Sequence, residues 1–373
     1  MDNRQVLEKA IEYAKSHRSF NKYTLVQNAK NVCVFGLGRY FKECFCERVK
    51  ENYHINLLSD NNPDLWGTEI DGLKVVSPAE LKAIDDLVVI IMVGRSSEVQ
   101  QQLESMGIVC VSHVDLSIDE NLGFEQNQEK IEREIPDIIQ ALDLYEDEES
   151  KRIYAHAIAK RISQGISDLT WKDLYSGGEY FGQDFMPIGD NEVYVDCGAY
   201  NGDTVLEFAD HVNDYEAVYA FELDHENYGE LVSRTNHLSN VICEEKGVYS
   251  EEKKIAYSIG EGEFDSREGI SIMKASEHAT HVQYSEVVTL DGYFGDRKVT
   301  LIKMDIEGCE EKALKGAGKL ITKQVPKLAI CVYHRTDDFW KLPQLIKKYH
   351  PLYKLYLRHH NIDNCWGSVL YAI

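Results

Sequence analysis

The sequence predicts an α/β protein with two Rossmann-like domains joined by a helical linker. In residues 28–118 and again in 190–373, short β-branched and aromatic runs alternate with segments of helical periodicity, which is typical of parallel sheets with crossover helices. In the second region, Val193–Val195 precede a glycine-containing turn and a helix, the opening unit of an open α/β sheet. We expect an N-terminal helix in residues 1–27 and an acidic helical linker with an aromatic loop in 119–189.

Composition limits the class of protein and its partners. The chain has 373 residues, of which 43% are hydrophobic, and this is enough for two cores. Its longest apolar run, Leu87–Val93, is too short to span a bilayer, and the N-terminus lacks the apolar core of a signal peptide. The nine cysteines show no paired spacing, which favours a reducing, cytoplasmic location. A net charge of −23 disfavours nucleic acid and anionic membranes as partners, whereas an oligomer is compatible with the sequence.

The elements of the first domain follow from three apolar runs and the helix signals between them. Strands are expected at Lys30–Phe35, Ile55–Ser59 and Leu87–Val93. A helix is expected to begin at Pro78, because proline favours the first helical position, and another covers Glu98–Met106.

The turn after the first of these strands reads Gly36-Leu37-Gly38-Arg39, and Asp60 ends the second strand. The third position of a dinucleotide fingerprint is Phe41 here, which disfavours NAD, whereas turn N–H groups and Arg39 suit an anion. Residues 60–78 resemble the N-terminal nucleotide-sugar-binding domains of some sugar-modifying enzymes. That resemblance implies a nucleotide-sugar or acceptor site in this domain, with an NAD-linked sugar oxidoreductase or epimerase as the alternative.

The linker is predicted to be mainly helical. Two amphipathic helices are expected over Ile131–Tyr145 and Glu148–Ile162, and we expect them to pack on both domains. The strong acidity of the linker is interpreted as a solvated helical surface. The aromatic and glycine-rich stretch Trp171–Pro187 suits sugar stacking, a packed loop or a lid over the following domain.

The stretch Glu192–Thr204 organises the second domain. Its strand ends at Asp196, and Gly198 and Gly202 follow at a spacing that departs from the dinucleotide fingerprint. The carboxylates of Asp196 and Asp203 repel a phosphate and attract a cation. S-adenosylmethionine carries a sulfonium and an amino group and no phosphate, so it suits this turn better than NAD.

An acid also ends the next predicted strand. Ala217–Phe221 leads into Glu222, about 20 residues after Gly202, where a carboxylate is placed to accept hydrogen bonds from ribose hydroxyls. The two acids in this order therefore favour a nucleoside-containing ligand at the edge where the strands end.

Several stretches of the second domain resemble the FkbM family of S-adenosylmethionine-dependent methyltransferases. They are Val193–Thr204, Tyr219–Asn227, Leu301–Glu310, Val332–His334 and Tyr356–His360. The resemblance covers about residues 180–373. It implies a class I methyltransferase fold with a terminal antiparallel strand pair, S-adenosyl-L-methionine as cofactor, and O-methylation of a sugar, glycan or secondary-metabolite hydroxyl.

The predicted cofactor contacts combine the turn, the acid and the positions that the resemblance adds at the adenine edge. They are Asp196, Gly198, Ala199, Tyr200, Gly202, Asp203, Thr204, Glu222, Leu223, Gly247, Val248 and Asp305.

The rest of the second domain is expected to continue the alternation. Strands are predicted at Val241–Cys243, Val287–Asp291, Val299–Met304 and Lys327–Val332, helices at Glu310–Ile321 and Phe339–Tyr349, and a final pair at Tyr353–Leu357 and Ser368–Ala372. Residues 260–285 lack periodicity and read as a substrate loop or a meander.

The predicted catalytic residues are His334 and Asp305, which end neighbouring strands and so face one crevice. Transfer to a hydroxyl requires alignment and removal of its proton. With an ordinary pKa near 6.5, His334 is the expected general base, and Asp305 orients it or holds the acceptor hydroxyl. Asp305, Glu307 and His334 also offer metal ligands, but we expect catalysis without a metal. For the residues, the alternatives are that Asp305 and Glu307 cap the following helix and that His334 is a structural histidine. For the protein, a further alternative is a non-catalytic protein that binds a nucleotide-sugar or glycan.

Overall fold

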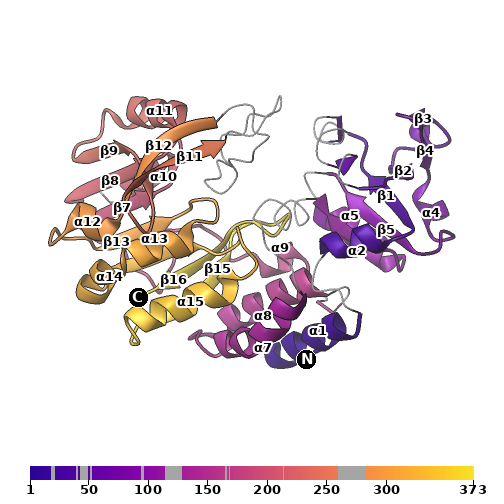
Figure 1. Cartoon of the computed structure of the whole chain (residues 1–373), viewed down its shortest axis with the longest axis horizontal. Helices are drawn as coiled ribbons and strands as arrows, with labels where there is room; N and C mark the ends of the chain where they lie inside the picture. Colours follow the sequence, from indigo (N-terminus) through magenta and orange to yellow (C-terminus); the bar gives the residue numbers. More distant parts are fainter. Residues whose placement is uncertain are drawn as a thin grey trace.

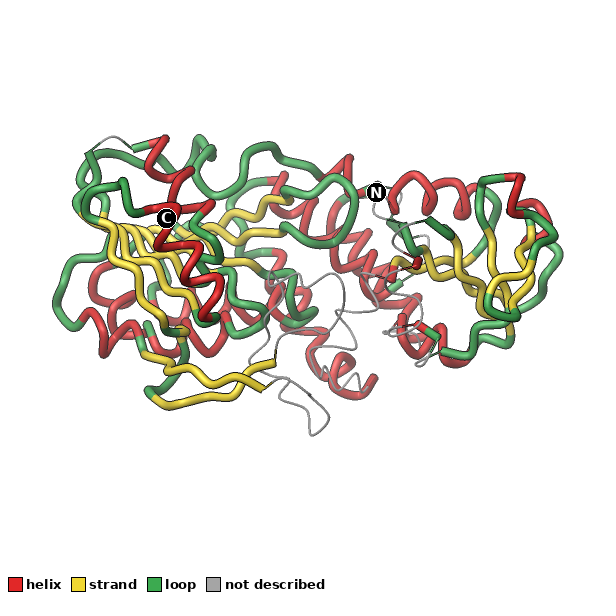
Figure 2. The backbone as a smooth tube through the Cα atoms, turned by 90° about the horizontal axis from the view of Figure 1, so that it is seen from above, coloured by secondary structure: helices red, strands yellow, loops and turns green. Residues whose placement is uncertain are grey.

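The computed structural model describes residues 1–17, 22–38, 41–42, 49–50, 53–93, 96–113, 128–163, 166–167, 169–212, 214–258 and 282–373. Within these residues the chain forms a six-stranded and a seven-stranded sheet, with a small three-stranded sheet beside the latter. Figure 1 shows the two large sheets at opposite ends of the molecule, and Figure 2 shows the same separation from above. The predicted α/β architecture with two Rossmann-like sheets is therefore confirmed.

The first sheet has the strand order β3-β4-β2-β1-β5-β6, in which only the β3–β4 pairing is antiparallel. Its elements are α2 (Lys22–Asn28), β1 (Asn31–Phe35), β2 (Leu57–Ser59), the 3₁₀ helix η2 (Pro63–Leu65), β3 (Glu69–Ile70), β4 (Leu73–Val76), α4 (Pro78–Leu81), β5 (Leu87–Ile91), α5 (Ser96–Ser105) and β6 (Val109–Ser112). Strand β5, which lies between β1 and β6, is buried along its whole length, which explains its uninterrupted Leu-Val-Val-Ile-Ile sequence. Strands β3, β4 and β6 were not predicted, because runs of two to four residues carry too little periodicity.

The second sheet has the order β15-β16-β14-β13-β7-β8-β9. Its strands are β7 (Val193–Cys197), β8 (Ala217–Glu222), β9 (Val241–Glu245), β13 (Leu301–Met304), β14 (Lys327–Cys331), β15 (Leu355–His359) and β16 (Ser368–Ala372). The first five run parallel, and β16 pairs antiparallel with both β14 and β15. The predicted terminal antiparallel pair is thus present, and the carboxyl ends of β7, β8, β13 and β14 meet at one edge.

Helices cover both faces of this sheet. They are α10 (Asp203–His211), α11 (His225–Thr235), α12 (Leu290–Phe294), α13 (Glu310–Gly316), α14 (Gly318–Gln324) and α15 (Asp338–Tyr349). The single helix expected over Glu310–Ile321 is interrupted at Ala317, because the Asp291 carboxylate accepts the N–H groups of Lys319 and Leu320 and so caps a second helix.

The segment before β13 also differs from the prediction. Strand β12 covers Val282–Val288 and pairs with β10 (Gly247–Val248) and β11 (Lys253–Ser258), and this ribbon projects from the large sheet in both views. Asp291 was expected in a strand but lies in α12, which begins after Thr289 caps it by accepting the Gly292 N–H at 3.0 Å. Of the expected substrate loop or meander, residues 260–281 lie outside the described part of the chain.

The N-terminal helix packs with the second sheet and not with the first. Helices α1 (Asn3–His17), α7 (Gln128–Leu142), α8 (Glu148–Ile162) and α9 (Trp171–Leu174) lie together near the middle of the molecule (Figure 1). Leu7, Ile138 and Ile158 are fully buried in the same apolar cluster as Val195 and Ile302 of the sheet. The linker helices therefore belong to the core of the second domain. In the described residues no helix is long and apolar enough to cross a membrane.

We predict that Leu7→Ala lowers the free energy of unfolding of the second domain by about 2–5 kcal/mol, the usual cost of truncating a fully buried leucine. Hydrogen exchange followed by mass spectrometry should show faster exchange in peptides from residues 190–373. Lys9→Ala, on the exposed face of the same helix, is the matched control. Faster exchange confined to residues 28–113 would contradict this assignment of α1.

Candidate active site

The edge where β7, β8, β13 and β14 end gathers most of the predicted site residues. Asp196 is the next-to-last residue of β7, Glu222 ends β8, Asp305 follows β13, and His334 comes three residues after β14. The parallel order of these strands accounts for this convergence, since it brings all four carboxyl ends to one side.

A buried ion pair lies at the base of the site. Asp196 and Lys303 face each other in register across β7 and β13, with Lys303 Nζ 2.9 Å from Asp196 Oδ1. Both side chains are almost inaccessible, at 0% and 3% exposure. Lys303 Nζ also donates to the Gly198 carbonyl at 2.7 Å, and the Thr204 hydroxyl donates to Asp196 Oδ2. This ion pair and its two hydrogen bonds thus hold together strands β7 and β13, the turn at Gly198 and the start of α10.

The ion pair changes the charge that the turn presents. Burial favours a neutral Lys303, but the carboxylates of Asp196 and Asp305 outweigh it and hold the pKa of Lys303 above its ordinary value. Because Lys303 neutralises Asp196, this carboxylate is not a free negative charge at the turn. The sequence predicted that Asp196 attracts a cation directly, whereas in the structure this carboxylate lies beneath the turn.

The turn itself depends on two glycines with positive φ. Gly198 has φ +80°, and a Cβ there would lie 1.9 Å from the Asp305 carbonyl oxygen, so only glycine lets the two strand ends approach. Gly202 has φ +85° and would meet Thr235 and Leu231 of α11. Tyr200 also has a positive φ, of +45°, and its N–H donates to Glu222 at 2.8 Å.

Glu222 faces the turn from the end of β8. Oε2 accepts the Tyr200 N–H and Oε1 accepts the Asp224 N–H, each at 2.8 Å. The side chain is 7% exposed, and burial raises the pKa of Glu222 to about 7. Each carboxylate oxygen has accepted one backbone hydrogen bond and retains a further lone pair for a ligand hydroxyl.

The remaining predicted cofactor residues lie around this acid. Ala199 is buried in the turn, Asp203 is exposed in the first turn of α10, and Leu223 directly follows Glu222. Gly247 and Val248 form the short strand β10, which pairs with β12 and contacts β8.

Asp305 is the centre of a polar cluster at the neighbouring strand ends. Oδ2 accepts the Tyr180 hydroxyl at 3.1 Å, and Oδ1 accepts the Tyr333 hydroxyl at 3.2 Å and lies 3.3 Å from His334 Nε2. Its side chain is 26% exposed, so it remains open to a ligand. Burial disfavours the charge, but His334 and Lys303 more than compensate and hold the pKa of Asp305 below its ordinary value.

His334 does not have the ordinary pKa on which its predicted role rested. Its Nδ1 lies 2.8 Å from Glu310 Oε1, and Nε2 faces Asp305 and Glu307. Burial favours the neutral ring, but Glu310, Glu307 and Asp305 together raise the pKa of His334 to about 10. His334 is therefore protonated at neutral pH in this structure. A protonated ring cannot accept the proton of the acceptor hydroxyl, as the predicted general base would have to do.

Four residues of the site were not predicted from the sequence. Lys303 lies within the strand predicted at Val299–Met304, but its pairing with Asp196 becomes visible only once the register of β7 and β13 is known. Tyr180 comes from the aromatic loop and Tyr333 precedes His334, while Glu310 was assigned to a helix start. Burial and the nearby Asp305 also raise the pKa of Glu179, in the same loop, to about 7.

In the first domain, the turn after β1 already holds an acid. The Leu37 N–H donates to Asp60 Oδ2 at 2.7 Å, and Gly36 has φ +99°. The Asp60 carboxylate therefore occupies one N–H donor of this turn, and the nucleotide-sugar site of the first domain stays a prediction. Arg39, the proposed cationic partner, lies outside the described residues.

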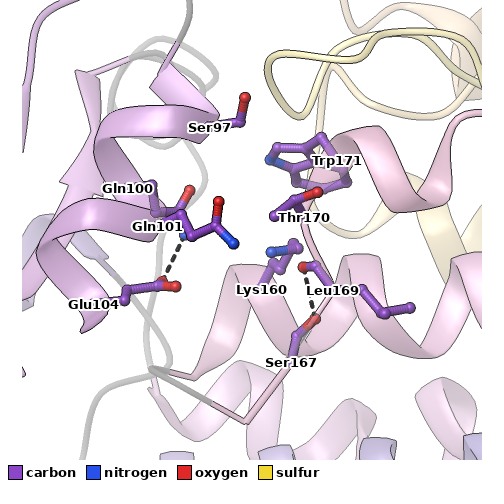
Figure 3. Close-up of a pocket in the computed structure, with 9 residues that line it drawn as sticks. All are labelled: Ser97, Gln100, Gln101, Glu104, Lys160, Ser167, Leu169, Thr170 and Trp171. Atoms are coloured by element: carbon purple, nitrogen blue, oxygen red, sulfur yellow. Dashed lines mark hydrogen bonds between the residues drawn. The ribbon is translucent and has the colours of Figure 1, made fainter.

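A small polar pocket lies elsewhere, between α5 and the linker. Figure 3 shows side chains of α5 facing those of α8 and α9. Its lining residues are Ser97, Gln100, Gln101, Glu104, Lys160, Ser167, Leu169, Thr170 and Trp171. None of the predicted site residues lines it, so it is separate from the edge described above.

Comparisons with known proteins agree with the geometry of this edge. The family model of the methyltransferase FkbM domain matches residues 196–361, and a C2185-like N-terminal model matches residues 28–110. The crystal structure of methyltransferase FkbM from Methylobacillus flagellatus KT superposes over 100% of both chains, with a TM-score of 0.68 and 20% identity. An rRNA methylase from Streptococcus thermophilus is 17% identical over 49% of this chain and 86% of its own, with a TM-score of 0.31. Fibrillarin from Aeropyrum pernix, solved with S-adenosyl-L-methionine, is 9% identical over 52% of this chain and 70% of its own, with a TM-score of 0.33. No curated protein matches the chain.

The seven-stranded sheet with its antiparallel terminal pair has the fold of a class I methyltransferase. Residues 196–361 match the methyltransferase FkbM domain, and the chain is an S-adenosylmethionine-dependent methyltransferase.

We predict that Lys303→Met destabilises the protein by about 3–5 kcal/mol, because it leaves the buried Asp196 carboxylate without its countercharge. Chemical denaturation measures this loss. The double variant Lys303→Met/Asp196→Leu should recover most of it, since neither charge is then buried. Lys323→Met, which breaks the exposed pair with Asp296, is the matched control and should leave stability unchanged. A Lys303→Met protein as stable as the control would contradict the role of the pair.

Proposed function

We propose that the enzyme transfers a methyl group from S-adenosylmethionine to a hydroxyl oxygen of a carbohydrate-like acceptor, such as a sugar, glycan or secondary metabolite. The observation that supports it is the cluster at the ends of β13 and β14. There a partly exposed Asp305 carboxylate is surrounded by two phenols and a protonated imidazole, all groups that hydrogen-bond hydroxyls. The carbohydrate-like character of the acceptor rests on the resemblance to the FkbM family.

In this proposal the cofactor lies between the Gly198–Gly202 turn and Glu222. The two Glu222 oxygens fit the two ribose hydroxyls, and the positive φ of both glycines brings the turn backbone close to the ligand. Leu223, Gly247 and Val248 would line the adenine side. The residues present therefore fit S-adenosylmethionine.

The roles of the two acids differ. Asp196 acts through the turn, because its oxygens are engaged by Lys303 and Thr204. Asp305 is ionised and partly exposed, so we assign to it the hydrogen bond from the acceptor hydroxyl, which fixes the direction of the oxygen lone pair.

Bound S-adenosylmethionine supplies an electrophilic methyl carbon on a sulfonium. The chain has to hold the acceptor oxygen in line with that carbon and exclude water. Tyr180 and Tyr333 serve this purpose by fixing Asp305 through their hydroxyl groups. His334 helps to keep Asp305 charged and is a positioning residue in this account.

The free cysteines support a cytoplasmic location. In the part of the chain that the structure describes, Cys33, Cys197, Cys243, Cys309 and Cys331 are free thiols. Thiols in this state are typical of a reducing compartment.

Acceptor chemistry can be tested by incubating the full-length protein with methyl-labelled S-adenosylmethionine and a panel of sugars, nucleotide-sugars and hydroxylated metabolites. We expect an O-methyl product, identified by NMR, and a kcat about 100-fold lower for Asp305→Asn, the scale of a lost positioning or proton-transfer group. Asp296→Asn, an exposed acid outside the site, is the control. Methylation on nitrogen or carbon, or full activity of Asp305→Asn with normal cofactor binding, would contradict the proposal.

Cofactor binding should depend on pH through Glu222. The ribose hydroxyls bind the ionised carboxylate, and the pKa of Glu222 in the free protein is about 7, so affinity is highest above pH 7 and falls below it. Calorimetry with S-adenosylhomocysteine should give a Kd about tenfold higher at pH 6 than at pH 8. Asp224 and Tyr257 are the titratable neighbours of this carboxylate.

Glu222→Gln is the matched variant for this experiment, because it keeps the shape and removes the titration. It should bind more weakly at pH 8 and lose the pH dependence. If the affinity of Glu222→Gln still depends on pH, another group causes the dependence, and this result would contradict the assigned contact between Glu222 and the ribose.

A further inference from the structure

We propose that Asp305, Glu307 and His334 form a binding site for one divalent first-row transition cation of the Mn²⁺ or Zn²⁺ class. The inference concerns ion binding by this chain. It rests on the proposed function in one respect only, namely that the group facing the ion is the hydroxyl of the methyl acceptor.

The geometry of the three side chains is that of ligands sharing an ion. One carboxylate oxygen from each acid and a ring nitrogen of His334 all lie within 4.8 Å of one another. His334 Nε2 is 3.3 Å from Asp305 Oδ1 and 3.6 Å from Glu307 Oε2. Ligand atoms at about 2.1 Å from a common ion are about 3.0–3.4 Å apart, so the His334–Asp305 separation already fits and the His334–Glu307 separation is slightly longer. The 3.6 Å separation is too long for a hydrogen bond.

His334 is oriented from behind, as metal-binding histidines are. The ring is 6% exposed, and its Nδ1 lies 2.8 Å from Oε1 of the fully buried Glu310. A carboxylate on Nδ1 fixes the tautomer, and Nε2 faces the ion once metal binding has displaced its proton.

The backbone holds both carboxylates toward the ring. Glu307 adopts φ +54°, a conformation that non-glycine residues rarely adopt, and Gly308 follows with φ +88°. Glu310 Oε1 accepts the Ile306 N–H at 2.9 Å, so the residue that orients His334 also fixes the loop between the two acids. Strained backbone of this kind persists where the surroundings determine it, and it clusters at functional sites.

The charges around the cluster favour a cation. Asp305, Glu307, Glu310 and Glu179 contribute carboxyl groups, whereas Lys303 on the same side is paired with Asp196. Asp305 and Glu307 are 26% and 32% exposed, so an ion can enter and keep positions for water or for an acceptor oxygen.

The donor set selects among cations. One imidazole nitrogen with two carboxylates suits Mn²⁺, Zn²⁺ and similar ions, whereas Mg²⁺ and Ca²⁺ prefer oxygen alone. An ion here would stand beside the acceptor position that we assign to Asp305 and would polarise a hydroxyl bound to it. This differs from the sequence prediction, which favoured catalysis without a metal.

The test is a titration of the metal-free full-length protein with Mn²⁺ alone, followed by EPR of the free ion. We expect saturable binding of one Mn²⁺ per chain, displaced by Zn²⁺ at micromolar and by Mg²⁺ only at millimolar concentration. Glu307→Gln, which is partly exposed and should fold, is expected to weaken binding at least tenfold. Glu310→Gln should weaken it 10- to 100-fold, as loss of an outer-shell partner does.

Glu311→Gln is the matched control, since Glu311 is the next residue along α13 and pairs with Lys315 away from the cluster. It should bind Mn²⁺ like the wild type. No saturable binding, or binding that Glu307→Gln leaves unchanged, would overturn the assignment. Because the measured quantity is bound metal, this result is independent of which acceptor is methylated and can be separated from failure of the proposed function.

Discussion

The structure of the second domain depends on one buried ion pair between its two central strands. Asp196 and Lys303 lie opposite each other on β7 and β13, and Lys303 also binds the Gly198 carbonyl while Asp196 binds Thr204. Removing one charge of such a pair leaves the other charge buried without a partner, which is strongly destabilising. The two residues must therefore be kept together or replaced together. Strand register, the glycine turn and the start of α10 are therefore fixed together, and the positions of Glu222 and Asp305 follow from them.

This constraint divides the sheet edge into two halves of different chemistry. On the side of β8, the turn and Glu222 offer a buried carboxylate with two free lone pairs, which suits a diol. On the side of β14, Asp305, Glu307 and His334 form a denser group of charges, supported by Glu310. Gly198 stands between the halves, where its missing side chain lets the turn reach the Asp305 carbonyl. A methyl donor in one half and an acceptor in the other would meet at this glycine.

The sequence predicted what local patterns determine. Strands that end in Asp196, Glu222 and Asp305 were predicted because a buried strand followed by an acid or glycine is visible in a short window. The protonation of His334 could not be predicted in this way. It depends on Glu310, 24 positions earlier, and on Asp305 and Glu307, which only the fold brings close to the ring. The break between α13 and α14 likewise depends on the distant cap Asp291, and the packing of α1 with the second domain depends on long-range burial. The short strands β3, β4 and β6 carry no periodic signal of their own.

The most direct measurement of the central claim is a crystal structure of the complex with S-adenosylhomocysteine. The account predicts that both ribose hydroxyls lie within hydrogen-bond distance of the Glu222 carboxylate. It also predicts that Asp196 keeps its contacts with Lys303 and Thr204 and does not touch the ligand. A ligand bound elsewhere, or one whose amino group displaces Lys303 from Asp196, would contradict the account.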